Sequence, residues 1–303
     1  MRSTMANLKE VRARLKSVAN TQQITKAMKM VSAAKLRRAQ DAITRLRPYA
    51  RKQNDMLRNI LSNLDGDTTT TFGVERPVNR VCVVVVTSNR GLAGAFNSNV
   101  IKSAVATIEE RFAAQKSAGN VDILPIGKKG FDYFKKRYPA KNILADYVEI
   151  FSDLSFDNVA RVSQHLMNAF ENGTYDMVTA SYGRFRNAAV QIAETDQWLP
   201  VEKLEVVEEA SAGPRFTADY IFEPSQQELL DYLVPSILQT TFQSYLLDTH
   251  ASEHGARMTA MDKATENAQE LMNDLRIFYN KARQEAITSE LSEIVGGAAA
   301  LEG

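Results

Sequence analysis

The sequence predicts an α/β protein in which two long helices, one at each end, form an antiparallel coiled coil beside a central Rossmann-like domain. Apolar residues step by three and four over residues 5–64 and again over the last quarter of the chain, which is the spacing of a coiled-coil seam. Between them, β-branched runs alternate with amphipathic stretches, which is typical of a mainly parallel sheet covered by helices. We therefore expect an N-terminal helix at 1–66, an α/β domain at 75–218 and a C-terminal helix at 225–303.

The seam of the two long helices is narrower than the apolar face of an ordinary globular helix, so we expect the two segments to pair with each other. Each buried Leu or Ile of such a seam contributes about 1.5 to 3 kcal/mol, more than an exposed ion pair does. The seam residues are Leu36, Ile43, Leu46, Leu57 and Ile60 in the first helix, and Met272, Leu275 and Tyr279 in the second.

Charge distinguishes the two helices, although the whole chain has a net charge of only +1. Residues 1–60 contain 15 Lys or Arg and 3 Asp or Glu, a net charge of +12, whereas residues 225–295 contain 5 and 11, a net charge of −6. Opposite charges favour pairing of the two helices, and the domain between them leaves enough chain for an antiparallel arrangement. The surplus positive charge of the first helix is left for an acidic partner.

The central domain is predicted from strand and helix patterns. The expected strands are 81–86, 121–126, 147–150, 175–182 and 189–194, and the expected helices are 97–112, 128–137 and 157–170. The run at 81–86 consists of valines and Cys82, so we expect it to be buried on both faces of the sheet. A capping box at 225–228 opens the last helix, and the glycine pair at 296–297 is expected to loosen its end.

Local spacing indicates no catalytic residue, metal site or cofactor site. His250 and His254 are four residues apart, a spacing used by zinc sites, but Ala251 stands where metalloproteases have glutamate. We interpret them as an exposed or interfacial helix face. The glycine turn at 88–94 follows a strand, as phosphate loops do, but it matches neither nucleotide-binding pattern. The single cysteine excludes an internal disulfide.

Four segments resemble the family of γ subunits of F-type ATP synthases, and together they cover nearly the whole chain. Residues 24–35 (ITKAMKMVSAAK) resemble the N-terminal helix of the family, and residues 251–261 (ASEHGARMTAM) resemble its C-terminal helix. Residues 87–97 (TSNRGLAGAFN) match its first strand, loop and helix. Residues 279–298 (YNKARQEAITSELSEIVGGA) resemble the segment by which the family is usually recognised.

The resemblance implies a non-catalytic central-stalk rotor. It would couple ion-driven rotation of the membrane c-ring to conformational cycling of the catalytic β subunits, for ATP synthesis or the reverse hydrolysis. The implied partners are three α and three β subunits, the ε subunit and the c-ring, through which membrane association is indirect. No nucleic acid and no cofactor are implied. The expected location is the cytoplasmic face of the bacterial inner membrane, and the alternative is the matrix face of the mitochondrial inner membrane.

The resemblance also assigns roles to residues of the two helices. One group would contact a β subunit, and a second group would turn as an apolar tip in a sleeve at the top of the ring. The β-subunit contacts are Met28, Lys29, Arg257, Arg283 and Gln284, and the apolar tip is Ile287, Leu291, Ile294 and Val295.

Two other functional classes compete with the rotor. One is an independent α/β enzyme or nucleotide-binding protein that carries a coiled-coil dimerisation arm. The other is a basic coiled-coil protein that binds nucleic acid. The basic face of the first helix has no aromatic residue before Tyr49, so it lacks a platform on which bases stack, and an acidic protein surface suits it as well. No stretch approaches the roughly 18 apolar residues of a membrane span.

Overall fold

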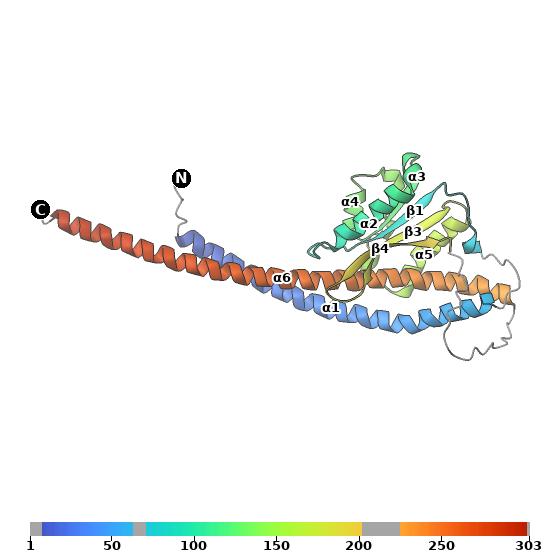
Figure 1. Cartoon of the computed structure of the whole chain (residues 1–303), viewed down its shortest axis with the longest axis horizontal. Coiled ribbons are helices and arrows are strands. Elements are labelled where there is room, and N and C mark those ends of the chain that lie inside the picture. The colour runs from blue at the N-terminus through green and yellow to red at the C-terminus, as the bar shows by residue number, and fades with distance from the viewer. Residues whose placement is uncertain (1–7, 63–70, 202–224, 302–303) are drawn as a thin grey trace. The chain divides into compact units, whose positions relative to one another are not determined.

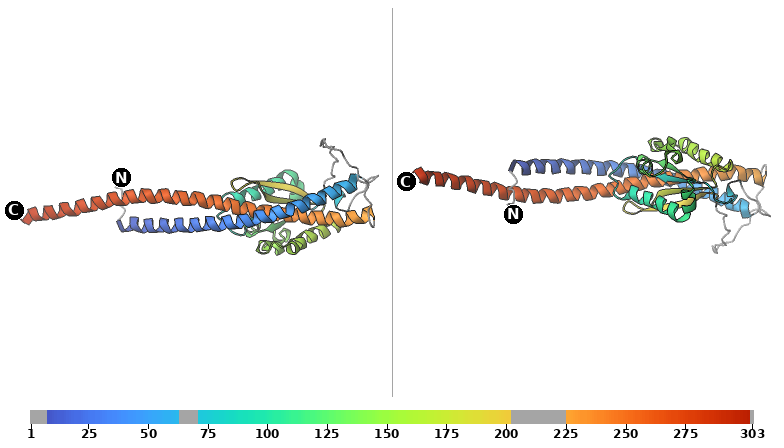
Figure 2. Two further views of the ribbon diagram at one scale, coloured as in Figure 1. Left: turned by 90° about the horizontal axis from the view of Figure 1, so that it is seen from below. Right: turned by 90° about the horizontal axis from the view of Figure 1, so that it is seen from above.

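The structure, a computed structural model, describes residues 8–62, 71–201 and 225–301 and confirms the predicted α/β fold class (Figure 1). The two long helices are α1, Leu8–Ser62, and α6, Gln226–Leu301. The chain divides into two compact units, which are Met1–Ser32 with Met258–Gly303, here called the helical unit, and Ala33–Arg257, here called the α/β unit. In each unit a length of α1 lies beside a length of α6 (Figure 2). The predicted boundaries, at 1–66, 75–218 and 225–303, divide the chain into consecutive segments rather than into these units, and they stay a prediction.

The α/β unit is built on a four-stranded sheet in the order β2-β1-β3-β4. Its strands are β1, Val81–Val86; β2, Val121–Ile126; β3, Met177–Phe185; and β4, Gln191–Leu199. β1 is parallel to both of its neighbours, and Val84 pairs with Leu124 on one side and Ala180 on the other. β4 is antiparallel to β3 because only a short hairpin joins them. The sheet is therefore mainly parallel, as predicted.

Both faces of the sheet are covered, which explains why all six residues of β1 are buried. Val81, Val83 and Val85 pack with α2 (Phe96–Arg111), whereas Cys82 and the alternate valines pack with α5 (Phe156–Glu171) and α6. The remaining described helices are α3, Ala113–Ser117, and α4, Lys128–Phe134, with 3-10 turns at Thr71–Gly73, Ala140–Asn142, Ala145–Tyr147 and Ile150–Ser152.

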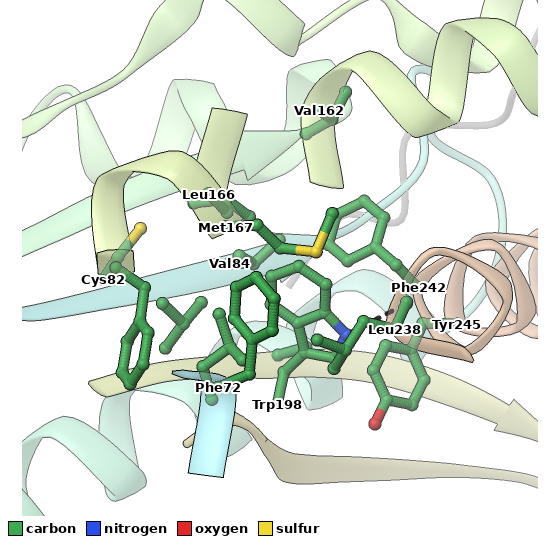
Figure 3. Close-up of a cluster of buried hydrophobic side chains, with 14 of the residues drawn as sticks. Phe72, Cys82, Val84, Val162, Leu166, Met167, Trp198, Leu238, Phe242 and Tyr245 are labelled. Carbon is green, nitrogen blue, oxygen red and sulfur yellow. Dashed lines mark hydrogen bonds between the residues drawn. The ribbon is translucent and has the colours of Figure 1, made fainter. Parts of the chain in front are cut away.

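Aromatic residues join β4 to α6 in the larger of the two cores (Figure 3). The Trp198 ring lies 5.2 Å from that of Phe242, and its indole Nε1 donates to the Leu238 carbonyl at 3.2 Å. Cys82 is buried in the same core, as its place in a valine run predicts. Burial raises the pKa of the Cys82 thiol far above its usual range, so the group stays protonated.

Two local predictions are wrong. Residues 147–150 form no strand, because the outer edge of β2 is already paired at Ile143, after which the chain turns into the 3-10 turns at Ala145–Tyr147 and Ile150–Ser152. The glycine pair at 296–297 does not end α6, which continues to Leu301 through three alanines, the best helix formers. The predicted connection at 201–218 lies, beyond residue 201, outside the described residues.

One of the two hydrogen bonds of the predicted capping box is present at the start of α6. The Ser225 hydroxyl accepts a hydrogen bond from the Glu228 amide at 3.2 Å, which satisfies one of the free N–H groups of the first turn.

Candidate functional site

The seam of α1 in the α/β unit is buried where the spacing predicts it. Leu36, Ile43 and Leu57 are buried, and Leu46 is half-buried. Gln53 continues the same step and donates its Nε2 to the Ser236 hydroxyl of α6 at 2.7 Å, so the seam includes one polar contact. The side chain of Ile60 lies outside the described residues.

The seam of α6 in the helical unit weakens toward the C-terminus. Met272 is buried, and Leu275 and Tyr279 are half-buried. The same step continues at half-buried Ala282 and Ala286, after which every described side chain is exposed. Pairing with α1 therefore covers one narrow stripe of α6, and no described residue of the chain covers its C-terminal end.

A polar section interrupts the seam of the helical unit. Three side-chain pairs join α1 to α6 there: Gln22 with Gln269 at 2.8 Å, Thr25 with Thr265 at 2.8 Å, and Lys29 with Asp262 in an ion pair. As the α1 position advances, its partner moves back along α6, which is the antiparallel order. Polar groups inside a seam restrict its register, because any slip leaves them unpaired. Sequence reasoning missed these pairs, although the polar residues occupy the three-and-four step.

The residues predicted to contact a β subunit lie in different environments. Met28 and Lys29 are half-buried, and the ammonium group of Lys29 is already paired with Asp262. Arg283 and Gln284 are exposed on α6. Arg257 is buried inside the α/β unit. Arg283 and Gln284 thus have the free side chains that a direct contact requires.

The predicted apolar tip is exposed along its whole length. Its side chains have exposed fractions between 49% and 68%, and the residues are Ile287, Leu291, Ile294 and Val295. These residues are three, four or one position apart, so they lie along one side of the helix, and a row of large apolar side chains in water is typical of a surface that another molecule covers.

The stretch of α6 at 251–257 is buried on every face of the helix. From one side, Thr249 and Ser252 hydrogen-bond the backbone N–H and carbonyl of Gly183 in β3, at 3.1 and 2.9 Å. An added Cβ at Gly183 would lie 2.4 Å from the Phe96 ring of α2 and 3.3 Å from the Ser252 Cβ of α6, so a larger residue here would crowd both neighbours. The helix is therefore tightly joined to the sheet at this point.

Arg257 is the charged centre of this buried stretch and is only 7% exposed. Its Nη1 forms an ion pair with Glu253 at 2.7 Å. Its Nη2 donates to the Arg90 carbonyl at 3.1 Å, and its Nε donates to the Gly91 carbonyl at 3.3 Å. Burial raises the pKa of the Glu253 carboxyl even with Arg257 beside it. The guanidinium thus ties α6 to the loop that follows β1.

That loop, residues 88–94, is a tight turn held by its own polar groups. Asn97 accepts a hydrogen bond from the Ser88 amide at 2.9 Å, and the single proton of the Ser88 hydroxyl is shared between the Arg90 carbonyl at 2.6 Å and the Asn97 Oδ1 at 3.0 Å. Leu92 has a φ of 62° and an exposed side chain. The loop carbonyls that face α6 are occupied by Arg257, which supports its interpretation as a structural turn.

His250 and His254 lie at the same junction. Their Nε2 atoms are 3.0 Å apart, and the His250 ring stacks on Phe151 with centroids 6.1 Å apart. In the described part of the chain, no group of three or more His, Cys, Asp or Glu is placed to hold a metal ion. Of the exposed and interfacial alternatives, the structure shows an interfacial face that packs within the chain, with His254 buried and His250 half-buried.

Comparisons with known proteins extend over almost the full chain. The family model described as ATP synthase matches residues 7–301. A protein named ATP synthase gamma chain from Cytophaga hutchinsonii is 50% identical over 299 residues, which are 98% of this chain and 99% of that protein. A protein of the same name from Flavobacterium psychrophilum is 50% identical over 300 residues, covering 99% of this chain and all of that protein.

A solved structure agrees with these relatives. One chain of the Euglena gracilis mitochondrial ATP synthase, in an assembly described as OSCP, F1 and c-ring, matches with a TM-score of 0.65 and 26% identity. The match covers 97% of the present chain and 94% of that chain. Both long helices and the sheet therefore lie within the compared region.

Proposed function

The chain belongs to the family of ATP synthase γ chains, and from this premise we propose how its paired helices transmit rotation. It is a central-stalk subunit of an ATP synthase and is not itself the catalyst. The observation that carries this conclusion is the 50% identity to bacterial γ chains over 98% of the chain. A central shaft shifts a catalytic subunit only by contacting its conformations differently, so the asymmetry of the shaft surface is the functional property.

The proposed partners are those of an F-type complex. ATP synthase subunits in general are its partners, and in finer detail we propose three α and three β subunits around the paired helices, with the ε subunit and the c-ring bound to the chain. The bacterial relatives favour the cytoplasmic face of the inner membrane over the mitochondrial matrix face. Within the described residues, no helix combines the length and apolar character of a membrane span. We propose, from the family, that membrane association passes through the c-ring.

We propose direct β-subunit contacts for Arg283 and Gln284, because both side chains are exposed. Lys29 would present its charge together with Asp262, and half-buried Met28 would contribute an apolar contact beside it. For Arg257, a contact would require the guanidinium to leave the loop carbonyls that it now binds. The exposed apolar tip would turn in an apolar sleeve formed by the surrounding subunits.

Removing the Arg283 and Gln284 side chains is expected to slow coupled ATP turnover about tenfold. A hydrogen bond from a charged group contributes about 1.5 to 3 kcal/mol, and 1.4 kcal/mol that is lost only in the driving conformation corresponds to a tenfold change in rate. The measurement is ATPase activity of the reconstituted complex with Arg283→Ala/Gln284→Ala, compared with exposed Lys281→Ala as the control. Helix content by circular dichroism should not change. An unchanged ATPase rate in the double variant, or a loss of its helix content, would contradict the proposed contact role.

The rotor role has a direct test against its competitors. The purified chain should not hydrolyse ATP alone, but it should restore coupled ATPase activity when it is mixed with α and β subunits. Robust hydrolysis or tight nucleotide binding by the isolated chain would favour an independent α/β enzyme. Salt-sensitive binding to DNA, with no affinity for α and β subunits, would favour a nucleic-acid-binding coiled coil.

A further inference from the structure

The junction of α6 and the loop at 88–94 is held by one guanidinium whose orientation depends on its neighbours. Arg257 binds the Arg90 and Gly91 carbonyls of the loop. On its other side it contacts the Glu253 carboxylate at 2.7 Å and the Nδ1 of His254 at 3.3 Å. How firmly Arg257 binds the loop therefore depends on the charge and the hydrogen-bonding groups that Glu253 and His254 place next to it.

The hydrogen bonds determine which nitrogen of each histidine carries a proton. A guanidinium only donates hydrogen bonds, so the Nδ1 of His254 must accept the one from Arg257 and carry no proton. The proton of His254 is then on Nε2, which donates to the Nε2 of His250 at 3.0 Å. His250 accepts there, so its own proton is on Nδ1. Both rings are neutral, and each is in a defined tautomer.

This arrangement also argues against a metal ion between the two Nε2 atoms. A metal bound at the Nε2 of His254 would move the proton of the neutral ring to Nδ1. That proton would then point at the N–H groups of Arg257, 3.3 Å away. The same conflict arises when His254 takes up a second proton, because both of its nitrogens then become donors.

We propose that the His250–His254 pair is a proton-sensitive latch, which holds Arg257 on the loop at 88–94 while both rings are neutral and releases that loop when they are protonated. A proton on the Nδ1 of His254 repels the Arg257 guanidinium. A proton on the Nε2 of His250 removes the acceptor on which His254 depends. Either event weakens the contacts that tie the loop to α6.

The charged groups around the two histidines also disfavour their protonation. Lys35 approaches from α1, Arg257 lies on the same helix, and Arg90 faces Glu253 from the loop. The Glu253 carboxylate also lies in this cluster, and Arg257 occupies it at 2.7 Å. Burial, together with Lys35 and Arg257, lowers the pKa of His250 to about 4, and burial with His250, Arg257 and Lys35 lowers that of His254 to about 3. The closed junction thus disfavours protonation of either ring.

The sign of the pH effect follows from these directions. An opened junction exposes both rings to water, where each regains a pKa near 6.5, so the open state binds protons that the closed state does not. The closed state is therefore favoured above about pH 6.5 and loses its advantage as the pH falls. Two such groups raise the opening equilibrium about 100-fold between roughly pH 7.5 and pH 5.5.

The consequence for the surface of the chain lies at Leu92. This residue is in the latched loop, with its apolar side chain 64% exposed and its backbone in the left-handed region. A released loop would no longer hold that side chain in one place. The latch thus links the proton concentration to the position of one exposed apolar side chain of the α/β unit.

Amide hydrogen exchange on the full chain provides the test. Loop opening frees the amides of Ser88 and Lys129, which are bonded to Asn97 and to the Ser88 carbonyl. Their protection factors, corrected for the intrinsic pH dependence of exchange, should fall about 100-fold between roughly pH 7.5 and pH 5.5. In His250→Leu/His254→Gln, which cannot be protonated at either position, they should stay constant within a few-fold.

The third histidine of the chain supplies the matched control. His165 is exposed on α5, so His165→Gln should keep the full pH response of the natural chain. An equal pH response in the natural chain and the double variant would overturn the latch, and so would a flat response in both. If the double variant does not fold, 15N NMR of the natural chain decides. A proton found on the Nδ1 of His254 at neutral pH would refute the proposal, and an unprotonated Nδ1 together with the 100-fold response would support it.

Discussion

Replacing Arg257 with alanine is expected to lower the free energy of unfolding of the α/β unit by about 3 to 5 kcal/mol. The substitution leaves the Glu253 carboxylate, 7% exposed, buried without its cation. It also removes the donors that serve the Arg90 and Gly91 carbonyls. The loss is measured by urea denaturation, in which unfolding is monitored by the fluorescence of Trp198. This residue is the only tryptophan of the chain and is buried in this unit.

Two further variants separate the buried charge from lost packing. Arg51→Ala removes an exposed arginine from the same unit and should change the free energy of unfolding by less than about 0.5 kcal/mol. Glu253→Leu combined with Arg257→Met removes both buried charges and should recover most of the loss, because no unpaired ion remains. If Arg257→Ala is as stable as the natural chain, the ion pair is not the element that holds the junction.

The regular elements could be predicted from the sequence because their cause is local. The bounds predicted for β1 and β2 equal the observed ones, since each is a mainly apolar run that stops at a polar residue or a glycine on either side. The seam at Leu36, Ile43 and Leu57 was predictable for a similar reason, because a step of three and four is a property of one helix. Neither prediction needs knowledge of a distant residue.

The failed predictions depended on distant contacts or on local competition. Residues 147–150 have strand-forming side chains, but the place beside β2 is taken by Ile143, which the pattern does not show. The glycine pair at 296–297 is a common helix end, yet the alanines that follow it extend α6. In both cases the residues were interpreted correctly as local preferences, and a neighbour determined the outcome.

The junction was the part of the site least accessible from sequence. His250, His254 and Arg257 are visible as residues of one helix, but Arg90 and Gly91, which give Arg257 its role, are more than 160 positions away. The lowered pKa values of the two histidines depend on burial and on the nearby Lys35 and Arg257, and Lys35 is also distant in sequence. The exposed Arg283 and Gln284, by contrast, were assigned through family resemblance alone, and that assignment stays a prediction until the reconstituted complex is measured.

Replacing Gly127 with alanine is expected to lower the free energy of unfolding of the α/β unit by about 3 to 5 kcal/mol. Gly127 joins β2 to α4 with a φ of 95°, and its amide donates to the Val148 carbonyl at 2.9 Å. An added Cβ would lie 2.0 Å from the backbone carbonyl oxygen of Thr87 and 2.7 Å from its carbonyl carbon. Backbone atoms cannot swing aside as a side chain does, so the end of β1 and the loop that Arg257 holds would have to move.

Gly119 makes it possible to separate the two causes of this loss, which are the strain of a positive φ and the clash of the added Cβ with Thr87. It also has a positive φ, 72°, but an added Cβ there meets no atom within 4 Å. Gly119→Ala should therefore cost only the conformational strain, about 1 to 2 kcal/mol, in the same urea experiment followed at Trp198. Equal losses in the two variants would mean that strain alone sets the requirement for glycine at 127. A larger loss at 127 would show that the close approach of β1 and β2 at this end of the sheet requires the glycine, and with it the position of the loop that reaches α6.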